Sequence, residues 1–195
     1  MEFLKKIKRF FMSSETIRQE ADCELCDKLS NCLKNDKSAI QRWEEQNLLI
    51  SPIFQHKLWN SAFFLFENGY RLDTPAYLNT PMKQKALSTL WMDDKTYYAM
   101  LSVSTPALLN YQDKKGNTLL HAMDDFYYHM QLRNADTILT RITDMVERGA
   151  NITIKNKNGD LPFKKISQYV GCAKNASVRR QFLKILQQQR EYTKA

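Results

Sequence analysis

Residues 115–123 read KGNTLLHAM, and residues 146–163 read VERGANITIKNKNGDLPF. Gly116 stands two residues before a Thr-Leu-Leu-His run, and Gly159 stands two residues before a Leu-Pro-Phe-Lys run. The whole chain contains only 5 glycines. Two of them in the same context indicate a repeated unit rather than isolated turns.

Helix-start signals recur upstream of these stretches, where a hydroxyl residue precedes proline at Ser51 and at Thr80. A Ser or Thr side chain caps the free N–H groups of a helix start, and proline at the first helical position loses no hydrogen bond. Helix starts are therefore predicted near residues 51, 80, 118 and 161. Their spacings of 29, 38 and 43 residues fall in the range of helical repeats.

Helix-end signals recur as well. Gly69 follows Phe-Glu-Asn, and Gly149 follows Val-Glu-Arg, each at the end of a helical pattern. Glycine suits the left-handed backbone that ends many helices, so a helix is predicted to end at each of these positions. The linkers 109–115 and 152–158 are polar and turn-rich, and each is predicted to project as a hairpin.

This order of features resembles the ankyrin repeat, in which a turn leads to a Thr-Pro-Leu-His helix start and a second helix ends in Gly-Ala. The resemblance is best over residues 106–163 and weaker over 51–83. It implies an all-α fold, a short ankyrin-like helical repeat solenoid with atypical capping ends. In such repeats the histidine of the motif holds the helix start and the neighbouring turn, which implies a structural role for His121. The residues alone also allow an irregular helical bundle whose turn residues mimic repeats.

The expected domain organisation has two parts. Residues 1–12 form a basic amphipathic N-terminal segment, and residues 13–195 form the repeat domain. Within that domain, residues 13–50 are predicted to be a capping pair of short helices broken at Asn35-Asp36. The unit that begins at 118 is about ten residues longer than a typical repeat, since the next predicted start is at 161, and residues 124–136 are the expected insertion.

Composition and charge narrow the class of protein. The chain has 195 residues, of which 43% are hydrophobic and 26% charged, as in ordinary globular proteins. Its longest apolar run, residues 62–66, is too short to span a membrane. The net charge of +8 divides into +3 for residues 1–12, +7 for residues 164–195 and −2 between them. A nucleic-acid-binding groove more often spreads its basic residues along one face, so no specific nucleic acid is expected.

The two basic ends have alternative interpretations. Residues 1–12 place apolar side chains on one face, so this segment can pack as a cap on the first repeat or lie weakly on an anionic membrane surface. The C-terminal segment is basic and rich in glutamine, as expected for the last unit of a solenoid, which needs a polar outer face.

Signals for chemistry are weak throughout the chain. The Cys-x-x-Cys of Cys23 and Cys26 lacks the second pair that a structural zinc site needs, and Cys32 and Cys172 do not supply one. Buried or half-buried reduced thiols are expected, with no metal and no cofactor. No nucleotide-binding or zinc-protease motif is present, and no catalytic residue is assigned. The chain shows no secretory signal, and a cytoplasmic protein that is not an enzyme is expected.

A repeat array offers a binding surface, so the function expected is a non-catalytic protein–protein interaction module whose partner is another protein. The residues chosen for partner binding, for their exposure on or beside the hairpins, are Tyr70, Tyr111, Asn151, Lys155 and Lys157. The competing class is a peripheral membrane or polyanion-binding protein that uses the basic ends. In style the chain resembles ankyrin proteins of intracellular bacteria, which implies an effector in the host cytoplasm.

Overall fold

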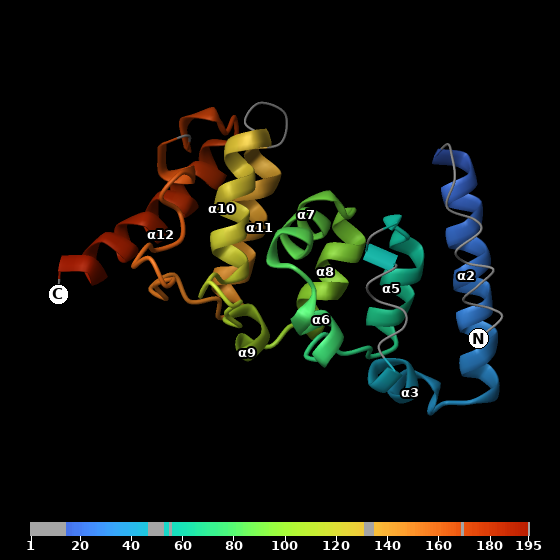
Figure 1. Cartoon of the computed structure of the whole chain (residues 1–195). Coiled ribbons are helices and arrows are strands. Elements are labelled where there is room, and N and C mark those ends of the chain that lie inside the picture. The colour runs from blue at the N-terminus through green and yellow to red at the C-terminus, as the bar shows by residue number, and fades with distance from the viewer. Residues whose placement is uncertain (1–14, 47–52, 55, 131–134, 169, 195) are drawn as a thin grey trace. The chain divides into compact units, whose positions relative to one another are not determined.

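The computed structural model describes residues 15–46, 53–54, 56–130, 135–168 and 170–194 (Figure 1). These residues form ten α-helices and two 3-10 helices and contain no strand, which confirms the predicted all-α class. None of the described helices is both long enough and apolar enough to cross a membrane. The predicted N-terminal segment, residues 1–12, lies outside the described residues.

The chain divides into two compact units. The first comprises residues up to Asn79 together with Met92–Val103, and the second comprises Thr80–Trp91 and Ser104–Ala195. The first unit contains α2 (Glu15–Asn35), α3 (Ala39–Gln46), α5 (Trp59–Glu67), α6 (Pro75–Asn79) and α8 (Asp94–Val103). Helix α5 packs against both α2 and α8 (Figure 1). The break after α2 falls at Asn35, as predicted.

The start of α5 is capped by a residue from another helix. Its own N-cap residue, Leu58, has no side chain that can accept a hydrogen bond. Asp22 of α2 is only 5% exposed, and its carboxylate accepts the backbone N–H groups of Asn60 and Ser61 at 2.8 and 2.9 Å. It also accepts the Ser61 hydroxyl at 2.6 Å. A buried contact between α2 and α5 therefore satisfies the free N–H groups of the helix start.

The second unit contains the remaining helices: α7 (Met82–Trp91), α9 (Pro106–Leu109), α10 (Leu119–Met130), α11 (Ala135–Glu147), η1 (Ile166–Gln168), η2 (Val170–Cys172) and α12 (Ala176–Lys194). Helix α10 packs against α7 and α11, and α11 packs against α12. The rings of Phe163 and Phe182, both buried, meet edge to face with their centroids 5.3 Å apart. This contact ties the segment before η1 to α12.

The predicted helix starts have different outcomes. Thr80 and Pro81 directly precede α7, and Thr118 directly precedes α10, as predicted. Residues 51–52 lie outside the described residues. No α-helix begins near 161, so that prediction is wrong. The reason is Phe163, whose φ of 75° lies in the left-handed region and interrupts a right-handed helix. The chain makes turns there and becomes helical only at η1.

The helices that end at the two predicted glycines share one geometry. After α5 the N–H of Tyr70 donates to the carbonyl of Leu65 at 2.9 Å, and after α11 the N–H of Ala150 donates to Met145 at 2.9 Å. Gly69 and Gly149 adopt φ values of 83° and 103°. Both ends are Schellman motifs, so the predicted helix ends are confirmed. Within the expected insertion, α10 continues to Met130, and residues 131–134 lie outside the described residues.

Candidate functional site

Two turns of the second unit have the same internal hydrogen bonds. In residues 113–117 the side chain of Asp113 accepts the backbone N–H groups two and four residues later, at 2.8 and 2.9 Å. In residues 156–160 the amide oxygen of Asn156 does the same at 2.9 and 3.0 Å. Gly116 and Gly159 occupy equivalent positions with φ values of 76° and 79°. The predicted alignment of these two glycines therefore corresponds to a structural equivalence.

The two turns lie directly against one another. The backbone N–H of Lys157 donates to the carbonyl of Lys115 at 3.0 Å, and the side-chain amide of Asn156 donates to the Asn117 side chain at 3.0 Å. The side-chain amide of Gln112 bridges the carbonyls of Gly116 and Lys155, at 2.7 and 3.2 Å. The linkers that were predicted to project as separate hairpins are thus joined into one paired edge.

Asn110 joins the base of the first turn to the end of α11. Its side chain donates to the carbonyl of Gly149 at 2.9 Å and accepts the N–H of Asn151 at 2.6 Å. Two hydrogen bonds from one side-chain amide hold the chain on both sides of Ala150. The paired edge is therefore anchored to the helix that precedes it.

His121 has the structural role that the repeat resemblance implied. Its Nδ1 accepts the backbone N–H of Thr118 at 3.1 Å and lies 2.9 Å from the Thr118 hydroxyl. Because Nδ1 accepts, Nε2 carries the proton, and it donates to the carbonyl of Asp160 at 3.1 Å. The histidine thus joins the start of α10 to the second turn.

A buried lysine underlies the first turn. Lys85 of α7 is 3% exposed, and its Nζ lies 5.0 Å from the ring centroid of Tyr111. Burial lowers the pKa of Lys85 to about 8, and the nearby Asp113 carboxylate opposes this effect. The contact is a cation–π pair when the lysine is charged. Tyr111 is half-buried in this position, so it supports the turn as well as bordering the surface.

The structure corrects one of the five residues chosen for partner binding. Asn151, Lys155 and Lys157 are exposed, as expected. Tyr70 is 0% exposed, lies in the first unit, and has a hydroxyl without a hydrogen-bond partner among the described residues. The Schellman turn at Gly69 directs the next residue back onto its helix, which explains the burial. Burial also raises the pKa of Tyr70. Tyr70 is therefore a core residue and not a contact for a partner.

The paired edge carries four exposed lysines, which we call the lysine edge: Lys114, Lys115, Lys155 and Lys157. None of their ammonium groups forms an ion pair with any residue that the structure describes. The nearest acids in sequence are Asp113, whose carboxylate accepts backbone N–H groups, and Asp160, which pairs with Lys164. Lys114 and Lys115 were not among the expected site residues. Their signal in the sequence is a basic pair inside a turn that contains no apolar residue.

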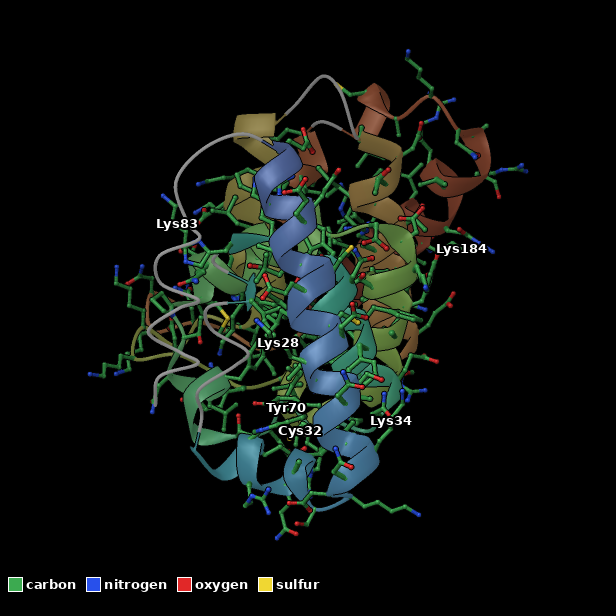
Figure 2. All side chains as sticks on the ribbon, turned by 90° about the vertical axis from the view of Figure 1, so that its right-hand side faces the viewer. Lys28, Cys32, Lys34, Tyr70, Lys83 and Lys184 are labelled. Carbon is green, nitrogen blue, oxygen red and sulfur yellow. The ribbon has the colours of Figure 1, made fainter. Side chains whose placement is uncertain are left out.

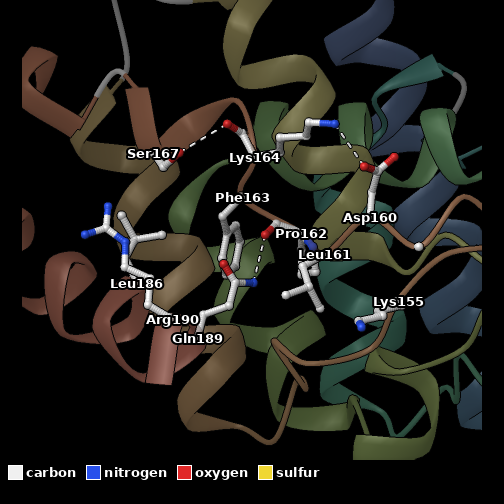
Figure 3. A pocket seen from close by; sticks show the side chains of 11 residues that line it. Lys155, Asp160, Leu161, Pro162, Phe163, Lys164, Ser167, Leu186, Gln189 and Arg190 are labelled. Carbon is white, nitrogen blue, oxygen red and sulfur yellow. Dashed lines mark hydrogen bonds and ion pairs between the residues drawn. The ribbon is translucent and has the colours of Figure 1, made fainter. Parts of the chain in front are cut away.

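An open pocket of about 430 Å³ lies beside this edge, and we call it the α12 pocket. Its lining residues come from the second turn, from the segments on either side of it and from α12: Lys155, Gly159, Asp160, Leu161, Pro162, Phe163, Lys164, Ser167, Leu186, Gln189 and Arg190. Leu161, Pro162, Phe163 and Leu186 form its apolar part. Three of the lining residues are basic, and one is acidic (Figure 3).

Gln189 holds the pocket together, although the glutamines of this segment were predicted to lie on a polar outer face. It is 9% exposed, and its side-chain amide donates to the carbonyls of Ile152 and Pro162, both at 2.8 Å. The signal was present: Gln189 follows Phe182, Ile185 and Leu186 at helical spacing and so occupies a position of the buried face. A glutamine on a buried face needs hydrogen-bond partners, and here those partners are backbone carbonyls.

The thiols are more exposed than predicted. Cys23, Cys32 and Cys172 are exposed, and only Cys26 is half-buried. Cys32 is exposed although it lies on the same face of α2 as the buried Leu25 and Leu29, at spacings of seven and three residues (Figure 2). Within the described part of the chain, no three His, Cys, Asp or Glu side chains gather in a way that could hold a metal ion.

No protein-family model, curated protein or solved structure matches the chain. The paired turns, the lysine edge and the α12 pocket are the features from which a function can be inferred.

Proposed function

We propose that the chain is a non-catalytic protein-interaction module whose lysine edge binds an acidic surface of another protein. The observation that carries this proposal is the set of four exposed lysines without ion-pair partners among the described residues. The turns below them are joined through backbone groups, so the lysines stand on an ordered support. An ordered loop costs less conformational entropy on binding than a flexible one.

In this proposal the paired turns belong to two ankyrin-like repeats. Three observations support the repeat character. The two turns share one hydrogen-bonding pattern and lie 43 residues apart. The helix before the second turn ends in a Gly-Ala Schellman motif. His121 joins the start of α10 to the following turn.

A protein is favoured over a polyanion as the partner. The edge contains lysines only, whereas arginine is the residue that matches phosphate with two parallel hydrogen bonds. Lys155 belongs both to the edge and to the α12 pocket, whose apolar part includes Leu161 and Phe163. An apolar centre with a polar, charged rim is the usual composition of a protein–protein interface.

The test begins with capture of a partner from cell lysate on the immobilised chain, identification by mass spectrometry and titration calorimetry with the purified partner. The edge variant combines Lys114→Glu, Lys115→Glu and Lys157→Glu. We expect it to lower the affinity by about tenfold or more, since it replaces attraction by repulsion. The matched control, with the same change of charge at exposed lysines elsewhere, combines Lys37→Glu, Lys174→Glu and Lys184→Glu.

A second comparison separates protein binding from the polyanion and membrane class. Deletion of residues 1–12 is expected to leave the affinity for the partner unchanged. If this deletion abolishes binding while the edge variant retains it, the basic N-terminal segment is the functional element and the proposal is wrong. A steep loss of affinity with added salt, together with binding to anionic vesicles, would point to the same conclusion.

A further inference from the structure

We propose that the α12 pocket binds an extended acidic peptide segment of the partner, with one apolar side chain inserted between flanking carboxylates. This inference rests on the proposed function and goes beyond it, because it names the chemistry that the partner must carry. It is argued from the pocket's apolar part, its charges and the hydrogen-bonding capacity of Gln189.

The apolar part of the pocket suits a single large apolar side chain. Leu161, Phe163 and Leu186 line it within a volume of about 430 Å³. Phe163 is held rigidly: its ring packs on Phe182 at 5.3 Å, and its φ of 75° is a conformation that few residues other than glycine adopt. Such a strained backbone persists only where the surrounding packing enforces it. The pocket is therefore formed before any ligand arrives.

The charges around the pocket favour carboxylates. Lys155 and Arg190 lie on opposite sides of the apolar part, as Figure 3 shows. Asp160 is the single acidic residue of the lining, and it already pairs with the ammonium of Lys164 at 2.9 Å. A ligand with acidic residues on both sides of an apolar one would thus meet a cation at each end. The chain's own residues 1–12 carry four basic residues and one acidic residue, so they do not complement this pocket.

Gln189 offers a contact for the peptide backbone. Both hydrogen bonds of its side-chain nitrogen go to backbone carbonyls of the chain itself. Its amide oxygen makes no hydrogen bond with a described residue, so it remains able to accept an N–H group. An extended peptide exposes its N–H groups, whereas a helix uses most of them internally.

The test uses three fluorescein-labelled synthetic peptides of five residues and measures binding to the full chain by fluorescence anisotropy. The first peptide has a central leucine flanked by two glutamates on each side. In the second, lysines replace the glutamates, and in the third, alanine replaces the leucine. We expect the first to bind, the second to show no saturable binding, and the third to bind about tenfold more weakly, since burying a leucine side chain is worth roughly that factor.

Two double variants then locate the binding site. Lys155→Gln with Arg190→Gln is expected to weaken the first peptide at least about fivefold, because both flanking cations are lost. Lys174→Gln with Lys184→Gln removes the same charge outside the pocket, and Lys184 lies on α12 itself (Figure 2). This control is expected to bind as the unchanged chain does. Far-UV circular dichroism and thermal melting verify that both variants are folded.

Several results would overturn the inference: no saturable binding of the first peptide, equal binding of the lysine or alanine peptide, or equal weakening by the two double variants. If Lys155→Gln with Arg190→Gln lowers the melting temperature, the comparison of the three peptides on the unchanged chain still tests the inference. None of Lys114, Lys115 and Lys157 lines the pocket. If the first peptide does not bind while binding of the partner still depends on these three lysines, only the pocket inference is rejected.

Discussion

Gly116 lies against the backbone of Lys157, and a Cβ atom at Gly116 would stand 2.9 Å from the Lys157 amide nitrogen. Gly159 is the equivalent residue of the second turn and has nearly the same φ, 79° against 76°. A Cβ at Gly159 would meet nothing within 4 Å. The two glycines thus share a backbone requirement and differ in whether a neighbouring turn excludes a side chain.

The first prediction follows from this difference. Gly159→Ala is expected to destabilise the protein by about 1 kcal/mol, the cost of a left-handed backbone for alanine. Gly116→Ala is expected to cost roughly 1–3 kcal/mol more, because the two turns must also move apart. Urea unfolding of both variants measures the difference. Equal losses would show that the turns are not in contact in solution.

The second prediction concerns the buried cap of α5. Asp22→Ala is expected to lower the free energy of unfolding by about 1–3 kcal/mol, since it leaves buried N–H groups of the helix start without an acceptor. Asp27→Ala is the matched control, because Asp27 lies on the same helix and is exposed. Its effect is expected to stay within about 0.5 kcal/mol. A harmless Asp22→Ala would mean that α2 does not cap α5.

The third prediction separates the ring of Tyr70 from its hydroxyl. Tyr70→Phe is expected to leave stability unchanged or raise it slightly, because the buried hydroxyl has no hydrogen-bond partner among the described residues. Tyr70→Ala is expected to cost about 3–5 kcal/mol through the cavity that it creates. Thermal or urea unfolding tests both. A large loss in Tyr70→Phe would reveal a partner for the hydroxyl.

The fourth prediction uses the lowered pKa of Lys85, which is about 8 in the folded chain against 10.5 for the ordinary side chain. Between these values the unfolded chain binds a proton at Lys85 that the folded chain does not. Stability therefore rises with pH across this window. From pH 7.5 to 9.5 the unchanged chain should gain on the order of 1–2 kcal/mol relative to Lys85→Met.

Because other groups also titrate in this range, the quantity measured is the difference in the free energy of unfolding between the unchanged chain and Lys85→Met at each pH. Urea unfolding at both pH values provides it. An unchanged difference would show that Lys85 is solvated in the folded chain, and that its ammonium does not rest on the Tyr111 ring. A difference that falls with pH would contradict the direction of the pKa shift.

Local signals in the sequence predicted part of the fold well. Gly69 and Gly149 identified two helix ends, and Gly116 and Gly159 identified two equivalent turns, because a left-handed backbone is a local requirement that glycine meets. The helix start near 161 was predicted from the same kind of local signal and is absent. There the packing of Phe163 on Phe182 outweighs the helical tendency of the segment, and residue patterns do not reveal such a distant contact.

The candidate site was predictable to a smaller extent. The polar linkers indicated Asn151, Lys155 and Lys157 correctly as exposed residues, since hydrophilic turns seldom become buried. Tyr70 was misassigned because a tyrosine after a helix-ending glycine can face either the solvent or the core, and the tertiary packing decides. Gln189 and Arg190 join the pocket through contacts with segments roughly 30 residues away, which no local pattern predicts.

The hydrogen bonds that pair the two turns come from backbone groups and from the side chains of Gln112, Asn117 and Asn156, and none comes from a lysine side chain. Substitutions of the side chains at Lys114, Lys115, Lys155 and Lys157 therefore change the charge of the edge and leave the hydrogen bonds that build it in place. A combinatorial library randomised at these four positions should for the same reason yield mostly folded members, each with a different recognition surface.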